Sequence, residues 1–294
     1  MTRARFLAAL LLALAPTACR SPAPASEATE FSVLAWNIWH GGREDGEIVG
    51  PQRVIEVIRE SGADLVAMQE TYGSGELISA GLGFHFHPRG TNVSIHSRFP
   101  ITADVSVFEE FKCVGAVVEL PTGDPLAFVS IWLPYDAEIW EVGTRDGKTR
   151  EQLLAACASS ASDLEQILVQ LEQKLAASGF AGVPVVIAGD FNSMFHLDYT
   201  EAERDQYDYV IDWPTSRVIT ARGFRDAYRA LHPRVNRALD RTWTPRFPEQ
   251  QEDRIDFVYD TLEDRHVVEA RVIDEHPAGY PSDHAALLVR YCED

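Results

Sequence analysis

The chain has 294 residues, 46% of them hydrophobic, and a formal net charge of -19 at pH 7. This length suits one large domain or two small ones, and no repeat of about 20 to 50 residues is visible, which sets repeat architectures aside. The acidic balance argues against a protein that binds by neutralising many phosphates with Lys and Arg. Phosphate chemistry stays open, because carboxylates can hold a divalent metal that meets the phosphate.

The first residues, MTRARFLAALLLALAPTACRS, predict an export signal. Arg3 and Arg5 form a basic head, and residues 6–14 form an apolar run that is too short to span a bilayer. We therefore expect a signal peptide over residues 1–18 and export from the cytoplasm. Residues 19–30 are rich in Pro, Ala and Ser, and this composition predicts a flexible tether.

The segment APTAC, which ends at Cys19, resembles a lipobox, the motif whose cysteine becomes acylated and stays on the membrane surface. Pro16 stands where this motif usually has Leu, so ordinary signal cleavage nearby is the alternative. If Cys19 carries lipid, Cys113, Cys157 and Cys292 remain, and that count is compatible with one disulfide plus one thiol. No CxxC or Cys/His cluster is present in the sequence, which argues against a structural zinc site.

After the tether, the pattern of apolar residues predicts many strands with a few helices between them. Pro51 opens a helix that Gly62 closes. A longer helix is predicted over residues 149–178, where Leu and Ile recur at helical spacing, and residues 217–233 predict two short helical turns. Strands are predicted within residues 31–38, 64–69, 84–101, 104–111, 115–120, 126–133, 184–191, 241–245, 254–260 and 284–292.

These elements fall into two halves, each with several strands and a helix. Such a pattern predicts an α/β fold in which two packed, mainly antiparallel sheets are flanked by helices, a four-layer α/β sandwich. We expect residues 31–294 to form this one domain.

Several of the predicted strands are apolar until their last residues and then end on a polar side chain. Alone, an Asn in such a place is usually a turn residue, and a Glu is usually a solvated strand end. A carboxylate inside an apolar strand needs a partner. Together, carboxylate and amide oxygens suit a hard cation such as Mg²⁺, and one imidazole suits general acid or base chemistry. The residues concerned are Asn37, Glu70, Asp190, Asn192, Asp256, Asp283 and His284.

These residues lie in motifs that resemble those of the endonuclease/exonuclease/phosphatase superfamily, the deoxyribonuclease I-like group, and of its exported bacterial members. WNI, MQE, HSRFPI, GDFN, RIDFVY and SDH occur in the family's order between residues 31 and 291. The resemblance implies the four-layer sandwich and hydrolysis of a phosphoester with Mg²⁺ or Mn²⁺. It also implies three metal ligands, which are Glu70, Asn37 and Asp283.

The resemblance further implies the roles of the catalytic residues. Asp190 positions or activates the attacking water, and Asn192 orients the phosphate or holds Asp190. His284 contacts the scissile phosphate, and Asp256 fixes the imidazole ring. Elementary chemistry agrees, because a phosphodiester needs a base for the water and positive charge near its oxygens.

Trp132 departs from the pattern, because many family members carry His or Tyr at this place, and indole cannot exchange a proton near neutral pH. Tyr135, Asp136 or His40 is a candidate for the missing role, and Trp132 is then a packing residue or a wall for the substrate. Arg43, which follows two glycines, is either a ligand of a phosphate oxygen or a solvated side chain.

The run HLDYT, which follows GDFN, resembles HLDWT in one bacterial branch of the family. On this resemblance we expect His196, Asp198 and Trp213 to line a pocket that is specific to the branch.

The residues therefore predict an exported, metal-dependent phosphoesterase that cleaves a phosphodiester or phosphomonoester by attack of water. A nuclease acting on DNA or RNA is the alternative, and a non-catalytic binding module with the same fold is a third interpretation. The net charge and the lack of a basic stripe disfavour tight binding of duplex nucleic acid. We expect a monomer, held at the membrane surface if Cys19 is lipidated.

Overall fold

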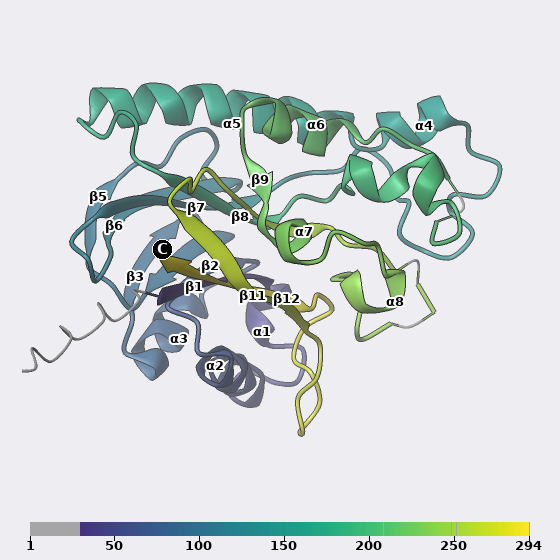
Figure 1. Ribbon diagram of the computed structural model, residues 1–294. Coiled ribbons are helices and arrows are strands. Elements are labelled where there is room, and N and C mark those ends of the chain that lie inside the picture. Colours follow the sequence, from purple (N-terminus) through teal and green to yellow (C-terminus); the bar gives the residue numbers. More distant parts are fainter. Residues whose placement is uncertain (1–29, 208, 248, 251, 294) are drawn as a thin grey trace, which may run out of the picture.

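The computed structural model describes residues 30–207, 209–247, 249–250 and 252–293. The predicted signal peptide, Cys19 and all of the tether except Glu30 lie outside these described residues. Two six-stranded sheets pack face to face. Figure 1 shows the long helix α5 (Ala158–Ala177) across one outer side, and α2 (Val49–Ser61) with α3 (Gly75–Leu82) across the other. The predicted four-layer sandwich is confirmed.

The first sheet has the strand order β11-β12-β1-β2-β4-β3. Residues of β1 alternate between two cores: Phe31 and Val33 pack between the sheets, whereas Leu34 and Trp36 pack with α2. β1 and β2 pair in parallel, and the other neighbours are antiparallel. The strands are β1 (Glu30–Asn37), β2 (Leu65–Gln69), β3 (His85–Arg89), β4 (Val93–Ser97), β11 (Arg265–Ile273) and β12 (Ala286–Glu293).

The second sheet has the order β5-β6-β7-β8-β10-β9. β7 and β8 pair in parallel, and the other neighbours are antiparallel. The two parallel pairs lie against each other across the core, and parallel strands end at the same edge. The carboxyl ends of β1, β2, β7 and β8 therefore gather at one end of the sandwich. The strands are β5 (Ile101–Asp104), β6 (Cys113–Glu119), β7 (Pro125–Trp132), β8 (Val185–Asp190), β9 (Arg225–Asp226) and β10 (Asp256–Asp260).

The helix predicted over residues 149–178 is two helices, which corrects that prediction. Thr149 begins α4 (Arg150–Ala155) with a reciprocal capping box to Gln152. Cys157, at φ -116° and ψ 16°, interrupts the helical path before α5 begins. The helix that Gly62 closes is confirmed as α2, and Gly62 takes the left-handed conformation there, at φ 71°.

Two predicted strands also need correction. β5 ends at Asp104, so the strand predicted over residues 104–111 does not form. In residues 241–245, Trp243 makes isolated bridges to Asp253 and His284 instead of entering a sheet. The helix α3 and the nine-residue strand β11 were not predicted. The remaining helices are α1 (Trp39–Gly42), α6 (Pro214–Ala221), α7 (Ala227–Leu231) and α8 (Arg237–Asp240), with 3-10 turns at His196–Tyr199 and Glu201–Glu203.

The three cysteines in the described residues, Cys113, Cys157 and Cys292, are free thiols. The disulfide that their number allowed is thus not formed. Within the described part of the chain, no helix combines the length and the apolar character needed to cross a membrane.

Candidate active site

The polar residues predicted at strand ends lie together at the carboxyl end of the two parallel pairs. Asn37 ends β1, Glu70 follows β2, Asp190 ends β8 and Asp256 begins β10. Asp283 and His284 come just before β12. A cavity of about 190 Å³ opens over them, and its lining includes Glu70, Asp190, Asn192, Asp283 and His284.

Asn37 connects the two sheets through two residues that line this cavity. Its Nδ2 donates to Glu70 Oε1 at 3.1 Å and to Asp190 Oδ2 at 3.2 Å. Its Oδ1 accepts the backbone N–H of Trp39 at 3.0 Å, which leaves one lone pair on that oxygen. One buried amide thus fixes the carboxylates of both sheets relative to each other.

Glu70 is held in an unusual backbone conformation, at φ 55°. Its backbone N–H donates to Asn92 Oδ1 at 3.0 Å, and its Oε2 accepts the backbone N–H of His40 at 3.1 Å. Such left-handed conformations cost about 1–3 kcal/mol in residues other than Gly and cluster at functional sites. Most of the other positive-φ residues besides Gly lie near this cavity, namely Trp39, His40, Tyr72 and Asn192.

The sequence GDFN forms a bend that aims two side chains into the site. Gly189 is at φ 148°, and a Cβ there would lie 2.1 Å from the carbonyl oxygen of Ile131, so only Gly lets β8 run this close to β7. Beyond it, the Asn192 backbone N–H donates to Asp190 Oδ1 at 2.9 Å. Asn192 Nδ2 donates to Asp190 Oδ2 at 3.2 Å and to the Leu133 carbonyl at 2.8 Å. Asn192 therefore holds Asp190.

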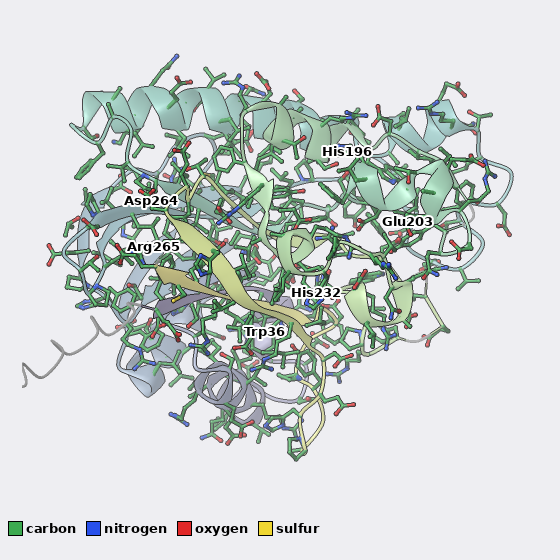
Figure 2. All side chains as sticks on the ribbon, in the orientation of Figure 1. Trp36, His196, Glu203, His232, Asp264 and Arg265 are labelled. Carbon is green, nitrogen blue, oxygen red and sulfur yellow. The ribbon has the colours of Figure 1, made fainter. Side chains whose placement is uncertain are left out.

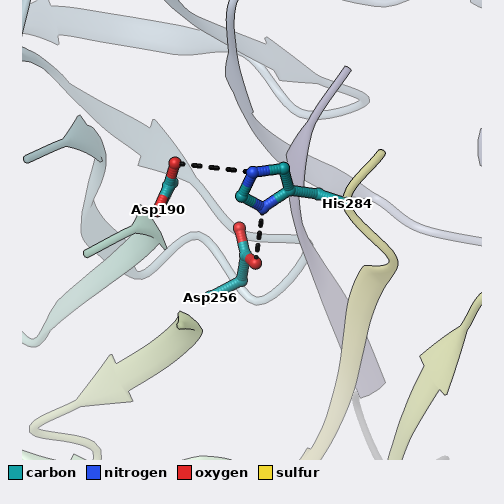
Figure 3. A group of neighbouring side chains, drawn as sticks. All are labelled: Asp190, Asp256 and His284. Atoms are coloured by element: carbon teal, nitrogen blue, oxygen red, sulfur yellow. Dashed lines mark hydrogen bonds and ion pairs between the residues drawn. The ribbon is translucent and has the colours of Figure 1, made fainter. Parts of the chain in front are cut away.

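His284 stands between two carboxylates, as Figure 3 shows. Its Nδ1 lies 2.9 Å from Asp256 Oδ2, and its Nε2 lies 3.9 Å from Asp190 Oδ2. Burial alone would lower the pKa of His284, but Asp256 and Asp190 outweigh it and raise the pKa to about 10. The ring is therefore an imidazolium at neutral pH, and Trp243 packs edge-on against it at a centroid distance of 4.9 Å.

Burial raises the pKa of two acids of the site, Asp190 and Asp283, even though His284 lies nearby. Burial, with a further contribution from Asp256, raises the pKa of Asp190 to about 7 against the opposing charge of His284. Burial and the nearby Glu70 raise the pKa of Asp283 to about 6, again against His284. A carboxylate with a pKa near the working pH is suited to act as a general base.

The donor set fits a hard divalent cation. Among the described residues that line the cavity there is no Lys or Arg to balance the carboxylates. Glu70 and Asp283, with the free lone pair of Asn37, offer oxygen ligands of the kind that Mg²⁺ prefers. Atoms of Asp190, Asp256 and His284 also lie within 4.8 Å of one another and form a second possible set of metal ligands.

The predicted substrate contacts are only partly brought together. His40, Trp132 and Tyr135 line the cavity. Arg43 does not, because its Nη1 donates to Ser74 Oγ at 3.0 Å and its Nε pairs with Glu47 at 3.5 Å. Asp136 also lies elsewhere, with Oδ2 accepting the Ser159 backbone N–H at 2.7 Å, near the start of α5. The candidates for the missing His or Tyr are thus reduced to His40 and Tyr135.

His196, Asp198 and Trp213, which were expected to line a pocket, do not line the active-site cavity. The His196 ring lies 2.8 Å from Ser216 Oγ of α6, and Figure 2 shows it beside that helix. Asp198 is buried in ion pairs with Arg229 and Arg254, and Trp213 is fully buried in an aromatic core. This correction has a simple cause: the acid and the aromatic ring have partners inside the protein.

Five residues of the cavity wall were not predicted as site residues, namely Trp39, Glu138, Trp140, Trp243 and Ile255. Glu138 and Trp140 lie in the long connection between β7 and α4, which has no periodic pattern. Trp39 follows the strand predicted over residues 31–38, and Trp243 lies within the strand predicted over residues 241–245.

Comparison with known proteins agrees with this geometry. A family model described as Endonuclease/Exonuclease/phosphatase family matches residues 34–284. The chain belongs to this family. Members of the family are hydrolases that act on phosphoester bonds.

Individual relatives are distant but cover the chain. An uncharacterized protein of Caenorhabditis elegans is 26% identical over 313 residues, which cover 96% of this chain and 98% of the relative. An endonuclease/exonuclease/phosphatase from Beutenbergia cavernae has a similar structure, with a TM-score of 0.60 at 17% identity over 90% of this chain and 72% of that one. An AP endonuclease from Archaeoglobus fulgidus has a TM-score of 0.59 at 18% identity, and the match covers 88% of this chain and 98% of that chain. At these identities the two structures support the fold.

Proposed function

We propose that this protein is a metal-dependent hydrolase that cleaves a phosphodiester or phosphomonoester with water. The observation that carries the proposal is the paired arrangement of Asp190 and the Asp256–His284 dyad beside the unbalanced carboxylates of Glu70 and Asp283. The first group supplies a base and a fixed positive charge. The second supplies ligands for Mg²⁺ or Mn²⁺, which would neutralise charge on the phosphoryl oxygens when bound.

The residues divide the reaction between them. Asp190 accepts a proton from water, whose oxygen forms a bond to phosphorus while the bond from phosphorus to the alcohol oxygen breaks. His284 donates a hydrogen bond to a phosphoryl oxygen, and Asp256 keeps its ring charged and oriented. The departing alkoxide takes a proton from solvent, and Asp190 later returns its proton to solvent.

The charge of the molecule favours a small ester over a polymer. A nuclease needs cationic side chains along a strand of phosphates, and the cavity is lined by carboxylates and aromatic rings instead. Export and a lipid anchor at Cys19 belong to the same proposal, on the strength of the N-terminal sequence. A monomeric state is proposed with them.

The test is hydrolysis of bis-p-nitrophenyl phosphate by the purified chain, with and without Mg²⁺ or Mn²⁺. We expect release of nitrophenolate that needs the metal and falls at least about 100-fold in Asp190→Asn. Release that continues in EDTA, or that Asp190→Asn leaves unchanged, would contradict the proposed chemistry.

A further inference from the structure

The cavity over the catalytic residues has a second part that the hydrolytic reaction does not use. Tyr135 and Trp140 meet edge-on there, with ring centroids 6.4 Å apart and an interplanar angle of 88°. Trp132 and Glu138 line the same cavity. Glu138 is exposed, and its Oε1 accepts the Trp140 backbone N–H at 2.7 Å. Two perpendicular rings, a third ring and a carboxylate make an acidic aromatic corner, formed by Tyr135, Trp140, Trp132 and Glu138.

An aromatic corner of this kind is chemically suited to a cation. The faces of Trp and Tyr attract ammonium groups, and aromatic cages are the usual way in which proteins recognise quaternary ammonium ions. Trp140 already lies against one cation, since the guanidinium carbon of Arg145 is 5.8 Å from its ring centroid. That charge is balanced by its ion pair with Asp253 and does not enter the cavity lining.

The charge of the whole site also favours a cationic group on the substrate. Four carboxylates line the cavity, on Glu70, Glu138, Asp190 and Asp283, and Asp256 lies behind them. One divalent cation would balance only two of these five charges, so the ionised site keeps an excess of negative charge. A second anionic group on the substrate is disfavoured there, whereas a positive group on its alcohol is attracted.

The size of the cavity limits the ligand to one small head group. Its volume of about 190 Å³ is below the roughly 300 Å³ at which pockets for drug-sized ligands begin. Such a space suits a phosphate ester of a short amino alcohol and leaves the second alcohol of a diester outside.

We propose that the substrates are phosphoesters of an alcohol that carries a quaternary ammonium group, as in phosphocholine, and that the acidic aromatic corner binds this group. The proposal rests on the hydrolytic function proposed above. Water attacks phosphorus, the bond to the other alcohol breaks, and choline stays on the phosphate. The same head group occurs on membrane lipids and on soluble glycerol esters.

A matched pair of chromogenic diesters tests this. p-Nitrophenyl phosphocholine and p-nitrophenyl 3,3-dimethylbutyl phosphate have the same leaving group and the same shape, and differ by the charged nitrogen. With Mg²⁺ present, we expect kcat/KM to be about tenfold or more higher for the choline ester. Equal values for the two esters would overturn the substrate class and leave the hydrolytic function standing. No cleavage of either ester or of bis-p-nitrophenyl phosphate would overturn both.

Variants locate the effect in the aromatic corner. Glu138→Gln and Tyr135→Leu should each lower the ratio of the two kcat/KM values by about threefold or more, whereas Tyr135→Phe should keep it. Glu141→Gln, a change of an exposed acid in the same loop, is the control and should leave the ratio unaltered. A ratio that survives both Glu138→Gln and Tyr135→Leu would overturn the assignment of the corner.

Two further experiments compare the choline ester with a nucleotide ester and a membrane lipid with a soluble ester. The p-nitrophenyl ester of thymidine 5'-phosphate presents a planar base in place of the ammonium group, and a kcat/KM at or above that of the choline ester would overturn the proposal. Release of phosphocholine is then measured from sphingomyelin vesicles and from soluble glycerophosphocholine. Release from one of them supports the proposal and identifies the carrier, and release from neither overturns it.

Discussion

Two clusters of buried charges lie side by side in this protein and are balanced in opposite ways. In the first, Arg254 pairs with Asp198 at 2.9 Å and with Asp226 at 2.6 Å. Arg229 pairs with Asp198 at 2.6 Å and with Asp240 at 2.7 Å. Burial would raise the pKa of Asp198, but Arg254 and Arg229 outweigh it and lower the pKa instead.

In the second cluster, the active site, the effect of burial on the acid pKa values exceeds that of the nearby positive charge. Burial raises the pKa values of Asp190 and Asp283, and among the described residues no guanidinium lies in the cavity lining to oppose it. Residues 253–256 connect the two clusters. Arg254 forms ion pairs in the first cluster, and Asp256 orients His284 in the second. The same fold therefore neutralises buried acids where only stability is needed and leaves them unbalanced at the cavity. On the proposed function, the missing positive charge at the cavity would come from a metal and from the substrate.

The largest difference should appear on removing one acid from the active site. Asp190→Asn should lower kcat for bis-p-nitrophenyl phosphate by about 10³-fold, because the water loses its base. The free energy of unfolding should change by less than about 1 kcal/mol, since an unbalanced buried charge is removed. Kinetics and urea unfolding on the same preparations check both, and a large loss of stability would show that Asp190 is structural.

The matching change in the ion-pair cluster should lower stability strongly and leave kcat nearly unchanged. Asp198→Asn leaves Arg254 and Arg229 with one buried acid fewer, so we expect a loss of about 3 kcal/mol or more in the free energy of unfolding. The kcat of the folded fraction should stay within about threefold of the natural protein. A collapse of kcat in a well-folded variant would mean that the two clusters are not separate in function.

The pH dependence of stability sharpens the same comparison. The folded-state pKa of Asp198 is lowered below its ordinary value of 3.8. Its stabilising contribution is therefore present above that pH and is lost as the pH falls through the folded-state value. Urea unfolding from pH 7 down to pH 3 should show the advantage over Asp198→Asn shrinking below about pH 4, and a constant difference would contradict the ion-pair account.

Metal binding should stabilise the active-site cluster selectively. At a Mg²⁺ or Mn²⁺ concentration of 100 times Kd, the free energy of unfolding should rise by about 2.7 kcal/mol. Glu70→Gln should abolish most of this rise, and Glu76→Gln, which removes an exposed carboxylate of α3, should keep it. A full metal response in Glu70→Gln would remove Glu70 from the ligand set.

The smallest effect is expected at Trp132. Its ring packs edge-on to Phe111 at 5.5 Å and forms a wall of the cavity. Trp132→Phe keeps an aromatic wall, so kcat/KM for bis-p-nitrophenyl phosphate should fall by less than about threefold. A much larger fall with intact folding would give the indole a role in the chemistry itself.

The sequence was most informative where local pattern and chemistry coincide. Asn37 and Asp190 stand at the carboxyl ends of apolar runs. Parallel strands place such ends at the same edge of a sheet. The position of the site could therefore be predicted. The break between α4 and α5 could not be predicted, because leucines continue at helical spacing across Cys157.

Long-range partners were the other limit. Asp198 was taken for part of a pocket, but its partner Arg254 lies 56 residues further along the chain. Glu138 and Trp140 belong to a loop without periodicity, and only the folded chain brings them over Asp190. Charge balance inside a protein depends on such distant pairs, which is why the contrast between the two clusters could not be predicted.

Anomalous diffraction from crystals soaked in Mn²⁺ tests the central claim most directly. The account predicts a manganese peak at the carboxylates of Glu70 and Asp283, and none among the ion pairs of Asp198. A map without a peak at Glu70, at Mn²⁺ concentrations that support hydrolysis, would contradict it.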